Sequence, residues 1–208
     1  MTDKLTLLIP AKKESESLPI FLKELETYKF KILIVLEEDD ITTINSLKNF
    51  SNLEILKQNN KGYGSALIEG INFIKTKYFC IINADGSMNP SYLEEMLLHI
   101  KYNDLIFTSR YMKEGGSEDD DIITLIGNKF FSTIGKIFFH LKINDILYTY
   151  VLGDTKKVQN LNLNFHDFRI CVELPILAHR SKLMYKCLPS KERKRIGGKK
   201  KVNPLKDG

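Results

Sequence analysis

Tyr78-Phe-Cys-Ile-Ile-Asn-Ala-Asp-Gly-Ser-Met-Asn-Pro90 is the stretch that decides the fold of this 208-residue chain. Its apolar part, residues 79–82, predicts a short buried strand. Small polar residues end the strand, and Pro90 favours a helix start because proline is accepted at a first helical position. The stretch therefore delivers side-chain oxygens to the carboxyl end of a strand, where open α/β sheets bind ligands.

The polar residues of this stretch alternate. Asn83, Asp85 and Ser87 would point the same way on an extended backbone. Their oxygens are hard ligands suited to Mg²⁺ or Mn²⁺ shared with a phosphate. Residues of these types also form ordinary strand-to-helix turns. Spacing alone leaves a metal site and a plain turn both open.

The strand pattern extends outward from this stretch. Apolar runs predict further strands at residues 5–9, 31–36, 53–57 and 105–108, with helical patterns at 17–28, 42–50, 62–77 and 90–102. Such alternation is typical of repeating β-α units, so we predict an α/β fold with a mostly parallel central sheet flanked by helices.

The second half of the chain changes character. We expect a helix at 122–141, a strand at 148–152, a helix at 168–179 and a strand at 183–188. The first of these helices is apolar along one side but is interrupted by Asn128, Lys129 and Lys136, so it is a poor membrane span. It is either a core helix or a helix lying in a membrane interface.

The overall composition, 43% apolar and 27% charged, is that of a soluble globular protein. Three widely spaced cysteines without a C-x-x-C pair argue for a reducing compartment and against a disulfide framework or a zinc site. The first apolar run, residues 5–9, is too short for a signal peptide. We therefore expect a cytoplasmic protein.

The positive charge is concentrated at the end of the chain. Residues 186–208 hold nine Lys or Arg and two acids, a net charge of +7, whereas the rest of the chain carries −2. Such a tail suits a phosphate, an anionic membrane surface or nucleic acid, and it is equally compatible with a solvated terminal run. Nucleic acid is disfavoured as a partner because Tyr185 is the only aromatic residue near the tail.

Two other segments follow predicted strands or precede predicted helices. Four acids at 37–40 suit either ligand binding or the first turn of a helix, where acids favour the helix dipole. Gly62 and Gly64 precede a helix, where glycines let backbone N–H groups approach an anion. Neither a complete dinucleotide fingerprint nor a P-loop is present.

Seven motifs occur in a definite order along the chain. They are Pro10-Ala-Lys-Lys-Glu14, Glu37-Glu38, Asn60-Lys61-Gly62-Tyr-Gly64-Ser-Ala66, Asn83-Ala84-Asp85-Gly-Ser87-Met-Asn-Pro90, Ser109-Arg110-Tyr111 with Gly115-Gly116, Asp145, and Arg195-Ile-Gly-Gly-Lys-Lys-Lys201. In this order they resemble the motifs of family 2 glycosyltransferases with the GT-A fold, and most closely the dolichol-phosphate mannose synthase and polyprenyl-phosphate glycosyltransferase subgroup. The chain departs from the family pattern at Lys13, Lys200, Asn83, Glu37 and Glu38, the last three of which replace aspartates.

The resemblance implies roles for individual residues. A nucleotide-sugar donor would contact Pro10, Lys12, Glu14, Glu37, Glu38, Lys61, Asn83, Ala84 and Asp85, with Mg²⁺ or Mn²⁺ on Asp85, Asn83 and Ser87. Asp85, Asp145 and Arg110 would be catalytic, Asp145 as the candidate base, and Arg110, Arg195 and Lys201 would hold an acceptor phosphate. It also implies a single domain at 1–190 (donor half 1–112, acceptor half 113–190), a basic tail at 191–208 and an inverting reaction.

The acceptor expected from these residues is a polyprenyl or dolichyl phosphate. A phosphate is already ionised and needs no general base, and the basic tail would hold the protein on the inner face of the plasma membrane. A saccharide hydroxyl in surface polysaccharide synthesis is an alternative that does require a base. A non-catalytic nucleotide-sugar-binding protein is another, because Asn83 removes one carboxylate from the metal motif.

Overall fold

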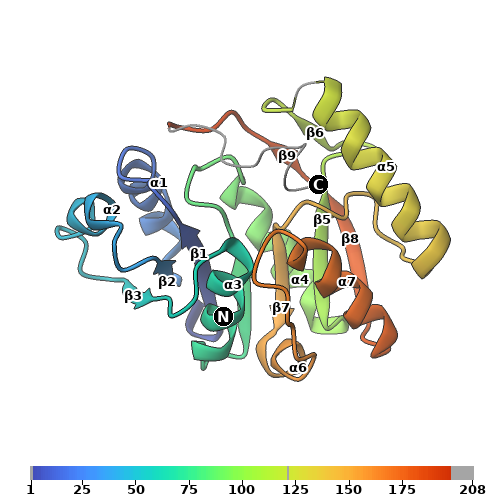
Figure 1. The fold of residues 1–208 in the computed structure, drawn as a ribbon, viewed down its shortest axis with the longest axis horizontal. Helices are drawn as coiled ribbons and strands as arrows, with labels where there is room; N and C mark the ends of the chain where they lie inside the picture. The colour runs from blue at the N-terminus through green and yellow to red at the C-terminus, as the bar shows by residue number, and fades with distance from the viewer. Residues whose placement is uncertain (1, 121, 198–208) are drawn as a thin grey trace.

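The computed structural model describes residues 2–120 and 122–197 and has a twisted central sheet with helices packed on both faces (Figure 1). The strands are β1 (Leu5–Ala11), β2 (Lys31–Leu36), β3 (Glu54–Lys57), β4 (Tyr78–Ile81), β5 (Leu105–Ser109), β6 (Gly116–Ser117), β7 (Val151–Asp154), β8 (Tyr185–Pro189) and β9 (Lys191–Glu192). The α-helices are α1 (Leu18–Leu25), α2 (Ile41–Ser46), α3 (Tyr63–Phe73), α4 (Leu93–His99), α5 (Ile122–Phe139), α6 (Thr155–Gln159) and α7 (Ile170–Arg180). Short 3-10 helices span Thr2–Lys4, Glu26–Tyr28, Pro90–Tyr92 and Ile100–Tyr102.

The strand order in the main sheet is β3-β2-β1-β4-β7-β5-β8. Every neighbouring pair is parallel except the two pairs made by β7, which runs antiparallel between β4 and β5. The predicted α/β class and mostly parallel sheet are therefore confirmed. A separate two-stranded sheet joins β6 to β9 in parallel.

Both faces of the sheet are buried. Leu7 and Ile9 of β1 pack with helices α1 and α4, while Leu8 packs on the other face with α3 and α7. A strand covered on both sides needs apolar residues at every position, which explains the continuous apolar runs of β1, β2 and β4.

Several boundaries differ from the predictions. The strand expected at 148–152 begins at Val151, because its antiparallel pairing to β5 begins where Val151 meets Phe107. The helix expected from Pro90 begins as a 3-10 turn, and regular α-helix starts at Leu93. Helix α3 ends at Phe73, four residues before the predicted end.

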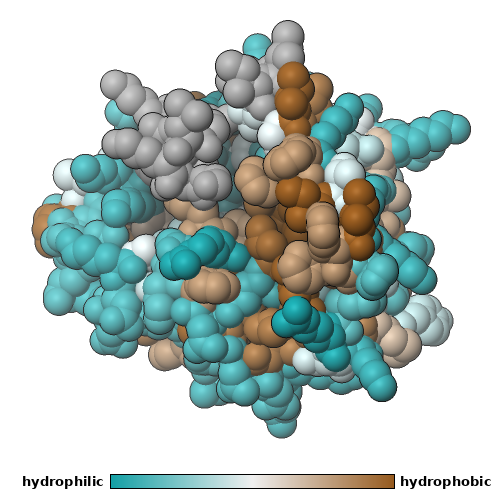
Figure 2. All heavy atoms as spheres, turned by 45° about the vertical axis from the view of Figure 1, so that its right-hand side comes forward, coloured by the Kyte–Doolittle hydropathy of each residue, from teal (hydrophilic) through white to brown (hydrophobic). Residues whose placement is uncertain are grey.

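Helix α5 lies at the outer side of the molecule, beyond the β8 edge of the sheet (Figure 1). Asn128, Ser132 and Gly135 face inward and are buried, whereas much of the opposite side is exposed. Figure 2, which turns this side forward, shows hydrophobic atoms gathered in a band on the surface. Helix α5 is therefore only half covered by protein. None of the helices described here has the length and apolar character needed to cross a membrane.

Candidate functional site

A cleft of about 1230 Å³ opens at the carboxyl ends of β1, β2 and β4. Residues 10–14, at the end of β1, line its sheet side together with four residues that follow β4: Asn83, Ala84, Asp85 and Ser87. Helices α5 and α7 line its far side. Lys12, Glu37 and Asp85 make the sheet side charged, whereas the α5–α7 side is mostly apolar, with Glu173 and Arg180 as its charged residues. The cleft thus occupies the place where open α/β sheets bind ligands.

The turn after β4 delivers three oxygen-bearing side chains to this cleft. Asn83, Asp85 and Ser87 all line it, as their alternation suggested. The Asp85 carboxylate accepts a hydrogen bond from the backbone N–H of Ser87 at 3.0 Å. Gly86 has a φ of +72°, a left-handed conformation that glycine adopts without strain, and this bends the chain around Asp85.

A divalent ion fits this turn only as one shared with a ligand. Asp85 offers one anionic group, while Asn83 and Ser87 offer neutral oxygens. Over residues 2–120 and 122–197, no group of three or more His, Cys, Asp or Glu side chains could hold a metal. Mg²⁺ completes its coordination readily with water and phosphate oxygens. The donor set therefore suits an ion bridged to a diphosphate rather than a site closed by protein.

The segment after β8 fastens this turn from the other side. The backbone N–H of Arg193 donates to the carbonyl of Ser87, and that of Ile196 donates to the carbonyl of Asp85, both at 2.8 Å. The Arg193 side chain donates to the Gly86 carbonyl at 2.8 Å. Ile196 also packs where a Gly86 side chain would be, so the position of the turn depends on residues more than 100 positions away.

Arg195 lies beside the aspartate of the turn. Its Nη1 is 3.8 Å from Asp85 Oδ2, and its Nη2 donates to Asp119 at 2.7 Å. The bond to Asp119 and the nearby Asp85 charge raise the pKa of Arg195. Arg195 was expected at an acceptor phosphate, but this position is at the charged, sheet side of the cleft. Lys201, expected to share that role, lies outside the described residues.

The residues after β1 and β2 form a second charged group. Glu37 is buried and pairs with Lys12 at 2.8 Å and with Lys61 at 3.6 Å. Lys13 has a φ of +53°, and its N–H donates to Asp40 at 2.6 Å. Although burial opposes it, the hydrogen bonds from Lys13 and the residues at 42–43 lower the pKa of Asp40. These contacts keep the end of β1 and the loop after it, with Pro10, Lys12 and Glu14, at the cleft wall.

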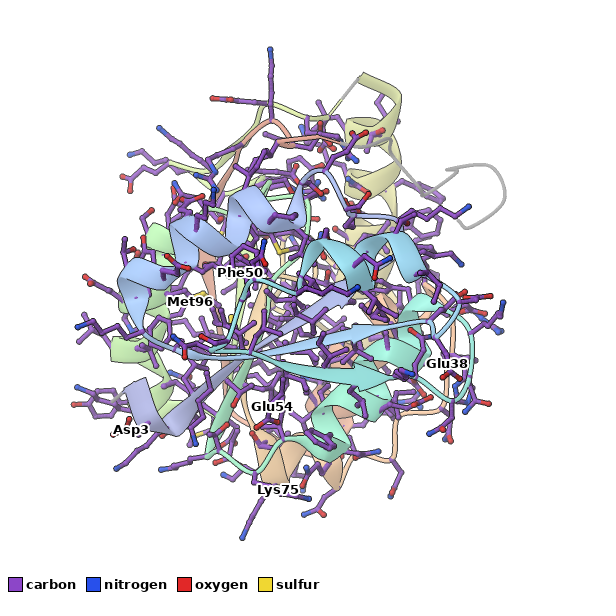
Figure 3. The ribbon with its side chains drawn as sticks, turned by 90° about the vertical axis from the view of Figure 1, so that its left-hand side faces the viewer. Asp3, Glu38, Phe50, Glu54, Lys75 and Met96 are labelled. Carbon is purple, nitrogen blue, oxygen red and sulfur yellow. The ribbon has the colours of Figure 1, made fainter. Side chains whose placement is uncertain are left out.

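Not every residue expected at the donor lies there. The Glu38 side chain is 75% exposed and pairs with Lys57 at 2.8 Å, so it points to solvent at the rim of the molecule (Figure 3). Lys61 reaches the cleft only through Glu37 and otherwise pairs with Asp39 at 2.9 Å. Ala84 lies at the cleft between Asn83 and Asp85. Of the expected acidic pair, Glu37 alone is placed to meet a ligand.

The backbone of residues 165–167 packs directly against Gly62 and Gly64 and fills the space beside them. A Cβ on Gly64 would lie 2.1 Å from the carbonyl oxygen of Phe165, and one on Gly62 would lie 2.2 Å from that of His166. The N–H of Ser65 donates to the His166 carbonyl at 3.1 Å. The chain itself therefore occupies the N-terminus of α3, where a glycine-rich turn can otherwise admit an anion.

That loop brings aromatic residues to the cleft. Phe168 stacks on Tyr63 with ring centroids 4.9 Å apart. The Tyr63 hydroxyl bonds to Thr149 at 2.6 Å and donates to Asn83 at 3.4 Å. Asn83 is thus held by a neutral hydroxyl from α3.

Arg110 lies at the centre of a buried ion cluster. It donates to Asp145 through Nε at 2.7 Å and Nη2 at 3.0 Å, and through Nη1 to Glu192 at 3.1 Å and to Asp120 at 3.2 Å. Both Asp145 oxygens are thereby engaged, and the side chain is fully buried and does not line the cleft. This geometry argues against Asp145 as a base and against Arg110 as a free phosphate ligand.

Sequence reasoning missed Asp119, Asp120 and Glu192, which line the cleft beside Arg110 and Arg195. Burial raises the pKa of Glu192 and outweighs the opposing effect of Arg110. Asp119 and Asp120 lie outside the seven motifs, and nothing near Glu192 in the sequence marks it. The apolar wall was missed as well; it consists of Phe131, Phe139, Leu147, Val172, Ile176 and Leu177.

Comparisons with known proteins agree with this architecture. The model of "Glycosyl transferase family 2" matches residues 6–161. Glucosyl-3-phosphoglycerate synthase from Mycobacterium tuberculosis, solved with Mn²⁺, UDP and glucosyl-3-phosphoglycerate, superposes with a TM-score of 0.69 at 11% identity, covering 97% of this chain and 74% of that one. Mannosyl-3-phosphoglycerate synthase from Rubrobacter xylanophilus gives 0.68 at 12%, covering 94% and 67%.

A fragment of S. aureus TarS gives a TM-score of 0.60 at 12% identity, covering 91% of this chain and 59% of that one. No curated protein sequence matches the chain. At these identities the superpositions establish a shared fold, the GT-A fold expected from the motifs.

Proposed function

The chain belongs to glycosyl transferase family 2, and from this premise we propose that it transfers a sugar from a nucleotide-diphosphate donor to a polyprenyl or dolichyl phosphate. The observation that carries the proposal is the cleft itself. One continuous space joins a charged side, around Lys12, Glu37 and Asp85, to an apolar wall on α5 and α7. A donor with two phosphates matches the first side, and an acceptor with a hydrocarbon chain matches the second.

The donor half of the proposal assigns a role to each charged group. The nucleoside would contact Pro10, Lys12, Glu14 and Glu37, and the diphosphate would lie over residues 83–85. A Mg²⁺ or Mn²⁺ ion held by Asp85, with Asn83 and Ser87, would neutralise the departing diphosphate. The Mn²⁺ or Mg²⁺ bound with UDP in the M. tuberculosis synthase supports this assignment.

Arg195 would bring a positive charge of the protein itself to the same diphosphate. Its guanidinium is 3.8 Å from Asp85 and carries donors in a fork that suits phosphate oxygens. We assign it to the donor diphosphate, whose negative charge grows as the sugar leaves. When the donor binds, Arg195 could release Asp119 and bond to a phosphate oxygen instead. Its guanidinium would then stay paired with an anion throughout the reaction.

A phosphate acceptor is consistent with the burial of Asp145, whose carboxylate is paired with Arg110 and does not face the cleft. A phosphate oxygen is already ionised, so attack on the sugar needs no proton acceptor. The M. tuberculosis synthase has been solved with phosphoglyceric acid and UDP together, so a protein of this fold binds a phosphorylated small molecule along with its nucleotide. The net charge of +7 over residues 186–208 favours an anionic membrane surface as the place of reaction.

A saccharide hydroxyl is the second candidate acceptor, and Glu192 is the observation in its favour. This carboxyl lines the cleft and its pKa is raised, as a general base acting near neutral pH requires. Its bonds to Arg110 and Ser117 would have to yield to the substrate.

Labelled sugar transfer separates these candidates. The protein is incubated with radiolabelled UDP- and GDP-sugars, Mn²⁺ and a polyprenyl phosphate in detergent, and the organic and aqueous phases are counted. We expect label in the organic phase with wild-type protein and none with Asp85→Asn. Label appearing only in a soluble oligosaccharide fraction would overturn the lipid-phosphate proposal.

A further inference from the structure

The outward side of α5 exposes an unusual amount of apolar surface. Ile126 is 63% exposed, Phe130 60%, Ile137 62% and Phe138 71%. Single exposed apolar residues are ordinary, but four large ones on one helix form a patch of the kind that marks an interaction site. Figure 2 shows the corresponding band of hydrophobic atoms on this side of the molecule.

The rotation of α5 that produces this patch is fixed by buried contacts. Asn128 donates to the Tyr111 hydroxyl at 2.8 Å, and the Ser132 hydroxyl accepts from the backbone N–H of Ile146 at 3.1 Å. Gly135 faces Ile146 so closely that a Cβ there would lie 2.9 Å from its side chain. The polar and small residues of the helix therefore face the protein, and the large apolar ones face outward.

The charged residues that α5 itself carries are positive. Helix α5 contains Lys129 and Lys136 and no acidic residue, and both lysines are exposed. They are seven residues apart, so both lie along one flank of the apolar stripe. Exposed Lys142 follows the helix. An apolar stripe bordered by lysines is the pattern of a helix that lies in a membrane interface.

We propose that the outward side of α5 (Ile126, Phe130, Ile137 and Phe138, with Lys129 and Lys136) docks on an anionic lipid bilayer. The apolar side chains would enter the boundary between headgroups and acyl chains, and the lysines would meet lipid phosphates. Charge favours this occupant over a second copy of the chain, since two such faces would bring lysines of like charge together.

Membrane docking by α5 deepens the proposed function and rests on it, because a lipid-phosphate acceptor is what gives the docking a role in the reaction. The inward side of α5 contributes Gly127, Asn128, Phe131 and Phe139 to the cleft. A bilayer on the outward side would therefore lie one helix diameter from the apolar wall. A lipid phosphate could then reach the cleft without leaving the membrane completely.

Tryptophan fluorescence tests the docking directly, because the chain contains no tryptophan. Phe138→Trp places one reporter in the patch, and Phe73→Trp places one at the exposed end of α3 on another surface. With phosphatidylcholine–phosphatidylserine vesicles we expect the Phe138→Trp emission to shift to the blue and to be quenched by brominated lipid. The Phe73→Trp emission should stay unchanged.

Vesicle sedimentation with matched triple variants supplies a second measurement. Ile126→Ser, Phe130→Ser and Ile137→Ser together remove the stripe, whereas Ile20→Ser, Ile41→Ser and Ile55→Ser remove three exposed isoleucines from α1, α2 and β3. Both triple variants keep the basic tail. We expect the first to bind the mixed vesicles roughly tenfold or more weakly than wild type, and the second to bind as wild type does.

Three results would overturn the proposal. The first is full vesicle binding by the stripe variant with a solvent-exposed tryptophan at 138, which means attachment through the tail alone. The second is no binding to vesicles at any lipid charge. The third is a concentration-dependent blue shift without vesicles, which means a second copy covers the patch. Because no nucleotide sugar is present, these results are independent of label transfer in detergent, which tests the proposed function alone.

Discussion

The guanidinium of Arg195 lies 3.8 Å from the carboxylate of Asp85 and 2.7 Å from that of Asp119. One cation thus joins the turn after β4 to the loop before α5. A ligand with two phosphates entering beside Asp85 would meet a positive charge that the fold has already placed. The segment after β8, which carries Arg195, also holds the turn through hydrogen bonds from the backbone N–H groups of Arg193 and Ile196.

Asp85→Asn should abolish metal-dependent turnover. The amide keeps the size of the side chain but removes the anionic ligand of the turn, so we expect kcat to fall by roughly 100-fold or more. Turnover measured against Mn²⁺ concentration checks this. Glu38→Gln is the control, since that side chain points to solvent and should leave turnover unchanged. Wild-type metal dependence in Asp85→Asn would contradict the assignment.

Arg195→Ala should weaken donor binding more than it weakens the fold. Hydrogen bonds to charged groups contribute about 1.5–3 kcal/mol, so the donor KM should rise roughly 10- to 100-fold. Steady-state kinetics with saturating acceptor provide the measurement. Lys57→Ala, which breaks the exposed pair with Glu38, serves as the matched loss of one cation. If the acceptor KM rises instead, Arg195 belongs to the acceptor phosphate.

Arg110→Gln should destabilise the protein strongly. It leaves Asp145, Glu192 and Asp120 without their shared cation, and breaking a buried ion pair costs about 3–5 kcal/mol. The free energy of unfolding in urea reports the loss. Arg169→Gln breaks an exposed pair with Asp167 and should change little. A small effect at Arg110 would mean that the cluster relaxes without it.

Glu192→Gln should change the pH dependence of stability. Burial raises the pKa of Glu192 above its ordinary value of 4.5, so the folded protein holds a proton that the unfolded chain has released. The stability from this group is present below pH 4.5 and is lost as pH rises through the folded-state pKa. Glutamine stays neutral throughout.

The unfolding midpoint of Glu192→Gln relative to wild type should therefore rise across the window that opens near pH 4.5 and closes above the folded-state pKa. Thermal unfolding across a pH series gives this difference. A difference that is flat or falls over the window is the unfavourable outcome for the burial argument.

Gly64→Ala should loosen the loop at 165–168. The added methyl group would meet two backbone carbonyls, those of Phe165 and Asp167, neither of which can rotate away. We expect a loss of roughly 1–3 kcal/mol in unfolding free energy. Gly116→Ala is the matched control, because nothing lies within 4 Å of the corresponding methyl position. Equal stabilities would show that the loop moves aside freely.

The sequence alone determined the β-α order, the mostly parallel sheet and the delivery of Asn83, Asp85 and Ser87 to a strand end. These features follow from local signals: apolar runs, turn residues and a proline read within about ten residues of one another. The family motifs added the donor residues after β1 and β2, and Glu37 lies at the cleft as they implied.

Only the tertiary structure decided which charged residues remain open to a ligand. Asp145 and Arg110 are 35 positions apart and occupy each other, while Arg195 reaches Asp85 from 110 positions away. The space beside Gly62 and Gly64 is occupied by the backbone of residues 165–167, and the spacing of residues in the sequence does not reveal this contact. The outward direction of α5 was equally hidden, because a helical pattern gives the apolar side but not what covers it. Ion pairing and burial depend on packing between residues far apart in the sequence. Whether a charged side chain can meet a ligand was therefore decided by its neighbours in space.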